Sequence, residues 1–309
     1  MLRSSVPVCQ AVVNRRFSMP SCLIFDSSVE AGTTSVAAVP GPGSQFMIGG
    51  AAMFLTFNDR PSDSPLVERV WRSHSHSAGV FLSVAASHFE IAVTRHNGRI
   101  FLTVRGPETK ATPADCPAEG EWLGIRFRLG TFMPGLTSGD LRDRHDVTLP
   151  GAASRSFWLN GSAWEYPDFE NADTFVARLV REGIIVRDAG VEAAIGSQPG
   201  HLPIRSTQRH FLRATGITHR TVLQIERARY ATTLLKQGVS ILDTVYEAGY
   251  FDQAHLTRSV KTLIGQTPVQ IRQGKRQLSF LYKTTPPPRI YDAHGRFDHD
   301  RIGTNHRPG

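Results

Sequence analysis

The sequence predicts an α+β protein, in which an N-terminal β-rich, barrel-like domain precedes an all-α region with two helix-turn-helix units. Apolar and polar residues alternate with a period of two in several segments between residues 54 and 149, which is typical of half-buried strands. Between residues 166 and 283 the apolar residues recur instead at helical spacing, with Gly residues where turns are expected. A chain of 309 residues is long enough for about two domains of ordinary size.

Both ends of the chain lack such patterns, and we expect both to be disordered. Residues 1–52 contain a Gly-, Pro-, Ser- and Ala-rich stretch, and their first part has the Arg- and Ser-rich, acid-free composition of an organellar transit peptide. A disordered extension, or sequence upstream of an internal start near Met53, explains this composition better. Residues 284–309 carry a Pro-Pro-Pro run and mixed charges, so we predict a disordered tail.

Residues 53–165 are predicted to form the β-rich domain, which we expect to sense a ligand or to dimerise. Its clearest local signal is a hairpin, with strand-like alternation over residues 89–95 and 100–104 on either side of Asn97-Gly98. This dipeptide supplies the two positive-φ positions of a type I′ turn. Together with further strands, the hairpin predicts a small barrel or a curled sheet.

Another strand is predicted over residues 122–129, and it has two charged side chains on one face. Arg126 and Arg128 alternate there with the apolar residues of the opposite face. The two arginines fit either a pocket for an anionic ligand or a solvated face of the sheet, and the solvated face is the better account.

No catalytic or metal-binding residue and no cofactor is predicted. A cupin-type metal site needs a Glu three or four residues after an H-x-H motif, but Glu90 lies 14 residues after His76 of His74-Ser75-His76. Exposed histidines in a Ser-rich loop explain this motif better. Cys116 lies in a Pro-rich loop without a neighbouring His, so we do not expect a nucleophile. The three scattered cysteines fit a reducing, cytoplasmic compartment.

The all-α region is predicted over residues 166–283. Its first helix begins at Asp168, which can cap, and continues with the apolar series Phe169, Ala172, Phe175, Val176 and Leu179. A short helix over residues 191–196 follows. Residues 205–216 then form the polar helix of a first helix-turn-helix unit, with Phe211 and Leu212 facing the core.

A long linker helix is predicted from Arg220 to Gln237, between the two units. Its buried stripe would consist of Val222, Ile225, Ala228, Ala231 and Leu235. In the second unit, Ser240 caps a short helix, Gly249 turns the chain and Asp252 caps the last helix. A helix of about 18 residues is roughly 27 Å long, and the turns add to this. One chain could therefore place two helices in successive major grooves of B-DNA, which lie about 34 Å apart.

Positive charge is concentrated in this region. Residues 200–285 contain 13 Lys/Arg and 4 Asp/Glu, a net charge of +9, whereas the rest of the chain contains 22 and 23, a net charge of −1. A localised positive charge favours a polyanionic partner through neutralisation of phosphates.

Several short motifs follow one another in the helical region. They are Gln208–Phe211 with Thr215-Gly216, Ile225–Arg229, Ile241–Asp243, Ala248–Tyr250, Asp252–Arg258 and Ile264–Pro268. Together they make residues 188 to 272 similar to the DNA-binding domain of the AraC/XylS family of bacterial transcription regulators. The loop before the first unit departs from the family pattern, since Pro203 stands where many members have a Ser cap.

The resemblance implies specific contacts with DNA. The positions that face the groove match Arg205, Gln208 and Arg209 in the first unit and Gln253, Ala254, Thr257 and Arg258 in the second. Arg can bond guanine bidentately, Gln can bond adenine, and Thr or Ala can contact a thymine methyl. Arg213, Lys261 and Arg220 are better assigned to phosphates, or simply to solvent.

The function predicted is that of a sequence-specific transcription regulator that binds promoter or operator DNA. A small-molecule effector, RNA polymerase and a second copy of the chain are left open as partners. No apolar run approaches the roughly 20 residues of a membrane helix, so no membrane partner is expected. The main alternative is a metal-dependent enzyme with a cupin-like β-domain targeted to DNA. A non-specific architectural protein is disfavoured, because binding to the DNA backbone alone would need only Lys and Arg.

Overall fold

The computed structural model describes residues 55–136, 138–143, 147–188, 190–191 and 204–274. All of these stretches lie within one compact unit, Met47–Gly309. The predicted N-terminal extension (residues 1–52), the predicted tail (residues 284–309) and most of the short helix predicted at residues 191–196 lie outside the described residues. We call residues 55–188 the strand-rich part and residues 204–274 the helical part.

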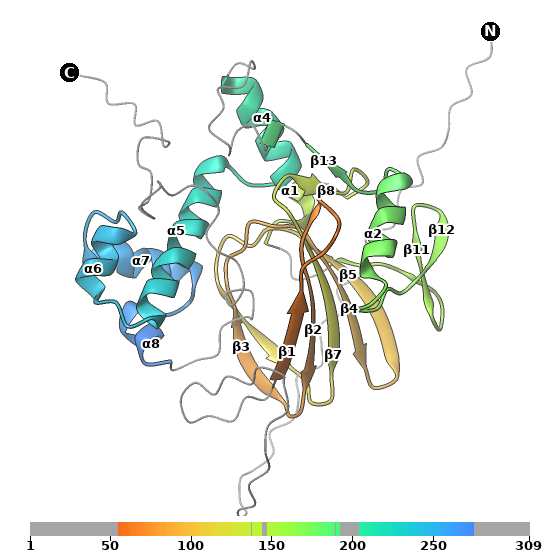
Figure 1. Ribbon diagram of the computed structural model, residues 1–309, viewed down its shortest axis with the longest axis horizontal. Helices are drawn as coiled ribbons and strands as arrows, with labels where there is room; N and C mark the ends of the chain where they lie inside the picture. The colour runs from red at the N-terminus through yellow and green to blue at the C-terminus, as the bar shows by residue number, and fades with distance from the viewer. Residues whose placement is uncertain (1–54, 137, 144–146, 189, 192–203, 275–309) are drawn as a thin grey trace, which may run out of the picture. The chain divides into compact units, whose positions relative to one another are not determined.

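A six-stranded antiparallel sheet forms the centre of the strand-rich part (Figure 1). In spatial order its strands are β1 (Leu55–Arg60), β2 (Val67–Ser75), β7 (Glu121–Phe127), β4 (Glu90–His96), β5 (Arg99–Arg105) and β9 (Val147–Thr148). The three strands predicted in this region correspond to β4, β5 and β7. Among the described residues the edge strands β1 and β9 each pair on one side only, so the sheet does not close into the predicted barrel.

The predicted hairpin turn is confirmed. Strands β4 and β5 pair in register up to His96 and Arg99, which leaves a two-residue loop. Asn97 has φ 50° and Gly98 has φ 71°, the positive values that a type I′ turn requires.

One hydrophobic core lies between this sheet and helix α2 (Ala172–Arg181). The helix buries Ala172, Phe175, Val176 and Leu179, which share a cluster with sheet residues such as Val93 and Ile125. A small sheet of β10 (Gly151–Ala153), β11 (Ser156–Leu159) and β12 (Ser162–Glu165) closes the cluster. Its Trp164 ring meets the Phe175 ring edge-on at 6.0 Å. Each large apolar side chain buried in this way contributes about 1.5–3 kcal/mol.

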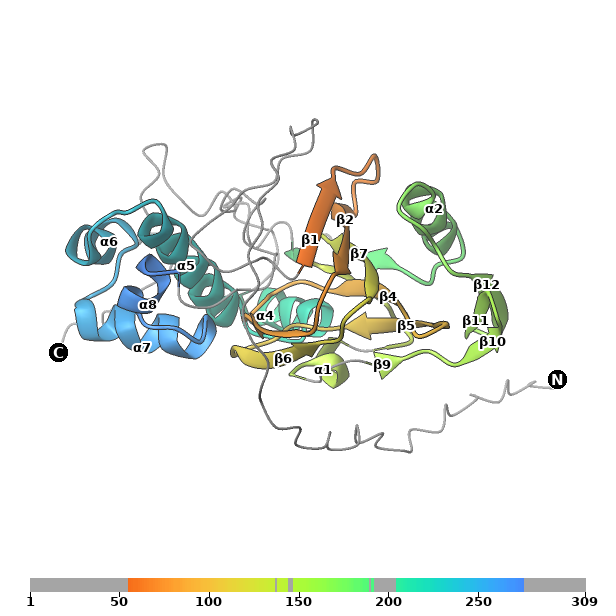
Figure 2. The same cartoon turned by 90° about the horizontal axis from the view of Figure 1, so that it is seen from below.

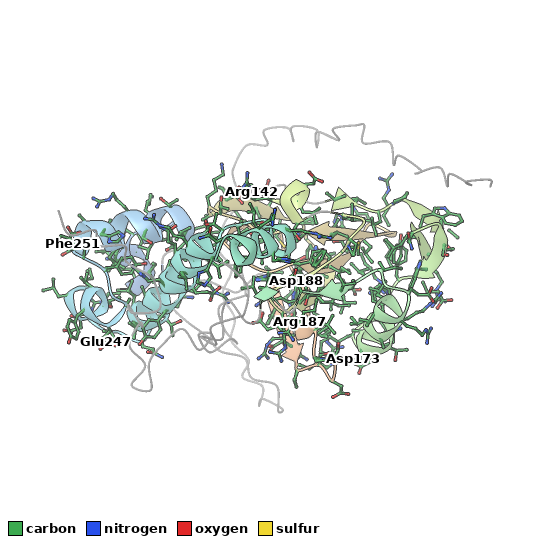
Figure 3. All side chains as sticks on the ribbon, turned by 90° about the horizontal axis from the view of Figure 1, so that it is seen from above. Arg142, Asp173, Arg187, Asp188, Glu247 and Phe251 are labelled. Carbon is green, nitrogen blue, oxygen red and sulfur yellow. The ribbon has the colours of Figure 1, made fainter. Side chains whose placement is uncertain are left out.

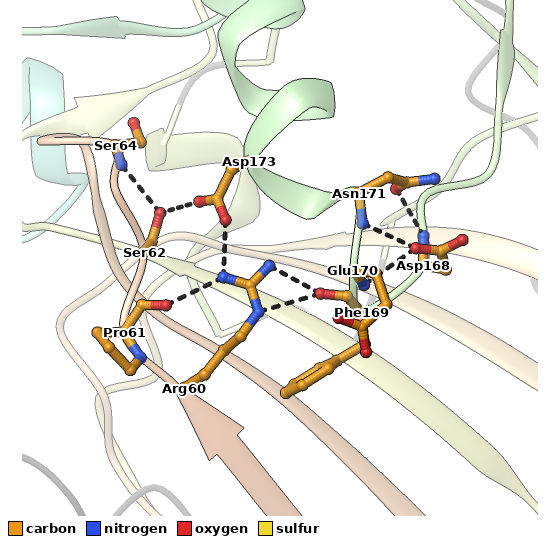
Figure 4. Close-up of polar contacts among 9 residues, drawn as sticks. All are labelled: Arg60, Pro61, Ser62, Ser64, Asp168, Phe169, Glu170, Asn171 and Asp173. Atoms are coloured by element: carbon orange, nitrogen blue, oxygen red, sulfur yellow. Dashed lines mark hydrogen bonds and ion pairs between the residues drawn. The ribbon is translucent and has the colours of Figure 1, made fainter.

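Helix α2 begins at Ala172, so the prediction that it begins at Asp168 is wrong. Asp168 Oδ1 accepts hydrogen bonds from the backbone N–H groups of Glu170 (3.0 Å) and Asn171 (2.8 Å), and Asn171 Oδ1 accepts from Asp168 N (2.9 Å) (Figure 4). These reciprocal bonds hold residues 168–171 in a turn. The Arg60 guanidinium also donates to the Phe169 carbonyl at 2.7 Å, which keeps that oxygen outside the helix.

Shorter elements complete the strand-rich part. They are the paired strands β3 (Gly79–Ser83) and β6 (Thr112–Cys116), the paired strands β8 (Thr131–Phe132) and β13 (Val186–Arg187), and the short helix α1 (Ser138–Leu141). Cys116 therefore ends a strand, where a loop was expected. It is buried, and burial raises the pKa of its thiol, which disfavours the reactive thiolate.

The helical part consists of five described helices (Figure 2). These are α4 (Ile204–Thr215), α5 (His219–Lys236), α6 (Ile241–Glu247), α7 (Gln253–Leu263) and α8 (Pro268–Arg272). Helices α6, α7 and α8 all pack against α5. Within the described stretches, no helix is both long enough and apolar enough to cross a membrane.

Local sequence signals explain where these helices begin and turn. Ser240 Oγ accepts from Asp243 N at 3.1 Å, and Asp252 accepts from His255 N at 2.6 Å, so both predicted caps are confirmed. Gly238 and Gly249 have φ values of 90° and 66°, which residues with a Cβ rarely adopt.

A second hydrophobic core lies around α5. All five residues of its predicted stripe are buried. In α4, Phe211 is buried as predicted, but Leu212 is 47% exposed, so its predicted place in the core is wrong. The buried positions of α4 include Ala214 and Thr215, three and four residues after Phe211, and Leu212 lies off that stripe. The same cluster also includes Leu82, Val84, Ala85 and Phe132 of the strand-rich part.

Candidate nucleic-acid interface

Helix α7 has one buried face and one exposed face. Leu256, Val260 and Leu263 are buried against the core, which orients the helix. The exposed positions include Gln253, Ala254, Arg258 and Lys261, with Thr257 partly exposed beside them. These five are the residues predicted to contact DNA in the second unit. Residues 253, 257 and 261 follow one another at a spacing of four, so they lie along one line of the helix.

The exposed face of α7 has the groups needed to bind base edges and phosphates. It combines an amide, a methyl, a hydroxyl, a guanidinium and an ammonium group. Within the described stretches, the side chains of Gln253, Arg258 and Lys261 have no intramolecular hydrogen bond or ion pair. Because no partner in the fold occupies them, these donors and acceptors are available to a ligand.

Helix α4 presents a similar polar face. Gln208, Arg209 and Arg213 are all exposed, while Phe211 is buried on the other side. Arg205 lies in the first turn of the helix, but its side chain is outside the described residues. Among the predicted phosphate contacts, Arg220 lies in the first turn of α5 and is exposed.

Three features near these helices were not predicted. His210 of α4 lies beside Asp188, with Nδ1 and Oδ2 3.4 Å apart. Phe251, directly before the cap of α7, is 91% exposed (Figure 3). Leu242 and Tyr246 of α6 are 70% and 72% exposed. Their spacing of four residues places them on one face of α6, but the spacing alone does not show that this face is exposed.

Arg126 has neither of the two roles considered for it, because it is only 1% exposed. Its Nε lies 3.6 Å from Glu90 Oε2, and His88 Nε2 lies 3.7 Å from the same oxygen. Burial opposes ionisation of Glu90, but the contact with His88 and the charge of Arg126 outweigh it and lower the Glu90 pKa to about 2. Burial, followed by the charge of Arg126, lowers the pKa of His88. Arg128, in contrast, is exposed.

The H-x-H motif lies at the end of β2 and just beyond it. The His74 and His76 rings meet edge-on at 4.8 Å, while Glu90 is engaged by Arg126 and His88. In the part of the chain that the structure describes, no group of three or more His, Cys, Asp or Glu residues is placed to hold a metal ion.

The strand-rich part also has an open cavity of about 520 Å³ at the β4–β5 turn. Its wall is polar and carries both charges, including Arg95, Arg99, Arg155, Glu121 and Glu165. The two arginines considered for an anionic pocket, Arg126 and Arg128, do not line it.

Comparison with known proteins identifies the helical part. Residues 201–274 match a protein family described as a helix-turn-helix domain. The regulatory protein Ada of Salmonella typhimurium is 31% identical to this chain over 108 residues, which is 35% of this chain and 29% of the relative. The match thus spans less than a third of that relative's length. No solved structure matches the chain. The resemblance to the AraC type is confirmed for the C-terminal domain.

Proposed function

We propose, from the AraC-type helix-turn-helix domain of residues 201–274, that this protein is a sequence-specific DNA-binding transcription regulator. The observation that carries the proposal is the exposed face of α7. Its amide, hydroxyl and guanidinium groups lack partners within the described residues, and its N-terminal end is held by the Asp252 cap. Recognition helices contact base edges mainly through their N-terminal residues.

The proposed roles of the side chains follow from their chemistry. Arg258 would bond a guanine, Gln253 an adenine, and Thr257 and Ala254 would contact a base edge or a thymine methyl. In α4, Arg205, Gln208 and Arg209 would contact bases. Arg213, Arg220 and Lys261 would bind phosphates and thereby position the two helices on the duplex.

Helix α5 would act as the linker between the two recognition helices α4 and α7. It has 18 residues, so its axis is about 27 Å long. With the flanking turns, this length suits two successive major grooves, which are about 34 Å apart. A single chain would then bind two adjacent half-sites.

Residues 53–165 would form a domain that senses a ligand or dimerises, and residues 166–283 would contain the DNA-binding domain. Helix α2 lies within the second range but packs on the sheet of the first, so the DNA contacts are assigned to the helical part alone. The polar cavity at the β4–β5 turn is a place where a small molecule with both charges would fit. RNA polymerase and a second copy of the chain are the other proposed partners, and the cytoplasm is the proposed location. The metal-dependent enzyme is disfavoured, because Glu90, the candidate carboxylate ligand, is already engaged by Arg126 and His88.

Selection from a random duplex library, with the purified full chain, tests the proposal. We expect enrichment of a bipartite site that binds at least about 10³-fold more tightly than random duplex at physiological salt. Mapping of bound sites in cells, with expression of adjacent genes measured in a deletion strain, should locate the same motif. Binding without preference over random duplex at every salt concentration would refute the proposal.

A further inference from the structure

The strand-rich part donates hydrogen bonds to the last turn of both α4 and α7. Two backbone amides reach α7: Ala85 N donates to Leu263 O at 2.8 Å, and Ala111 N donates to Thr262 O at 2.9 Å. One side chain reaches α4: Ser138 Oγ donates to Ala214 O at 2.9 Å. Each of the two proposed recognition helices is therefore held at its C-terminal end by residues far away in the sequence.

These carbonyls belong to the group that a helix leaves without partners inside its own ladder. A residue that follows each helix satisfies one carbonyl nearer the helix N-terminus: Gly216 N donates to Leu212 O at 2.8 Å, and Gly265 N donates to Val260 O at 3.1 Å. The strand-rich part satisfies carbonyls nearer the end. Hydrogen bonds are directional, so these contacts restrain both the position and the rotation of each helix end.

Close packing supports the same restraint. A Cβ added to Gly216 would lie 2.4 Å from the Ser138 carbonyl oxygen, so α4 ends directly against α1. A Cβ added to Gly265 would lie 3.1 Å from Ala111 Cβ and 3.2 Å from Leu82 Cδ1. Leu82 is 5% exposed and belongs to the hydrophobic cluster of the helical part.

Helix α5, between the two recognition helices, is held from the same side. Ser87 Oγ donates to Glu226 Oε1 at 3.1 Å, and Arg229 Nη1 donates to the same oxygen at 3.1 Å. Glu226 is 6% exposed, so this contact is shielded from water. A hydrogen bond to a charged group stabilises more than one between neutral groups. The bond from Ser87 to Glu226 is therefore a third contact that holds the helical part on the strand-rich part.

We propose that the strand-rich part fixes the separation and the relative orientation of the two recognition helices. Ser138, Ala85 and Ala111 would then be positioning residues for DNA recognition. This inference rests on the proposed function. The contacts lie at the C-terminal ends of α4 and α7, whereas the N-terminal residues are expected in the groove. DNA and the strand-rich part can therefore hold the same helices at the same time, and the intact protein is specific for the spacing of its half-sites.

Spacing selectivity of the full chain tests this inference. The probes are duplexes with the selected bipartite site, with one or two base pairs inserted between its halves, and with one half-site alone. Ser138→Ala removes one contact to α4, and Ala111→Pro removes the amide that donates to α7. We expect each change to reduce the affinity ratio between native and altered spacing about fivefold, the effect of one hydrogen bond. Affinity for a single half-site should stay unchanged.

Ser75→Ala is the matched control. Ser75 is also buried and donates to Pro117 O at 2.6 Å, but that bond lies within the strand-rich part. This variant should keep the native spacing selectivity even if it unfolds at a lower temperature. Folded Ser138→Ala and Ala111→Pro variants with native spacing selectivity would overturn the inference, whatever their thermal stability. A wild-type protein that prefers no sequence would instead overturn the proposed function itself.

Discussion

Arg258 is the residue whose side chain best distinguishes base recognition from general attraction to DNA. It is exposed on α7, and within the described residues it has no partner in the fold. Arg258→Ala should cost about 1–3 kcal/mol of binding and relax specificity at one base position. Dissociation constants for the selected site and its single-base variants would measure this.

Arg181→Ala, on the exposed surface of α2, is the matched control and should change neither affinity nor specificity. A loss for Arg258→Ala that is equal across all base variants would assign the guanidinium to a phosphate instead.

His88 and Glu90 make stability depend on pH in two stages. Burial and the charge of Arg126 lower the His88 pKa below 6.5, so below that pH the unfolded chain takes up the proton first and stability falls. The Glu90 pKa is about 2 against 4.5 for the free group, so its contribution is present above pH 4.5 and is lost as pH falls towards 2. The free energy of unfolding should therefore decline first below about pH 6.5 and again below about pH 4.5.

His88→Asn should remove the first stage and shrink the second, because the contact with His88 is the largest contribution that lowers the Glu90 pKa. Urea unfolding followed across this pH range measures both. His76→Asn, at an exposed histidine, is the control and should retain both stages. Identical pH profiles for the wild type and His88→Asn would contradict the assignment.

At the scale of elements, the sequence predicted what short-range chemistry determines. The Asn97-Gly98 turn and the Ser240 and Asp252 caps depend on atoms within a few residues, and all three are confirmed. The buried stripe of α5 was also predictable, because its period of 3.6 follows from helix geometry.

Long-range contacts determined the features that the sequence did not predict. Arg126 looked like a surface residue because alternation shows which face a side chain is on but not what covers that face. The prediction that Asp168 caps α2 is wrong because the backbone near Asp168 has other partners. The Asp168 N–H group donates to the Asn171 side chain, and the Phe169 carbonyl accepts from Arg60. The open edges of the sheet depend on which strands pair, and a single sequence does not reveal those pairings. Apart from Arg205, whose side chain lies outside the described residues, and the partly exposed Thr257, the predicted DNA contacts lie at exposed positions. Their contact with DNA remains a prediction.

The cap of α7 gives a prediction for one element. Asp252→Ala removes the acceptor that His255 N uses at 2.6 Å, and should cost about 1 kcal/mol of stability. Asp252→Asn keeps an acceptor in the same place and should retain most of that stability. Urea unfolding, together with hydrogen exchange at the first amides of α7, would measure both effects. Equal losses in the two variants would show that the charge of Asp252, rather than its cap bond, stabilises the helix.

At the scale of the whole molecule, the boundary in net charge along the sequence does not coincide with the boundary between the two hydrophobic cores. The net charge of +9 lies in residues 200–285, while the rest carries −1. The hydrophobic cluster around α5 nevertheless includes Leu82, Val84 and Ala85 of the strand-rich part. The helical part therefore shares its core with a part of low net charge, while polar side chains of α4 and α7 stay exposed.

This distribution predicts how salt affects binding. The logarithm of the binding constant should fall linearly with the logarithm of salt concentration, with a slope of about −0.9 for each phosphate neutralised. Lys261→Ala and Arg213→Ala should each reduce the magnitude of the slope by about 1, and should weaken binding to specific and random duplex alike.

Arg155→Ala, at an exposed arginine in the strand-rich part, should leave the slope unchanged if that part faces away from DNA. Fluorescence anisotropy titrations at four or more salt concentrations would measure all the slopes. If Arg155→Ala and Lys261→Ala reduced the slope equally, the positive charge would act as a diffuse field. A change confined to the helical variants would place the phosphates along α4 and α7, because counterions are released only where a cation replaces them.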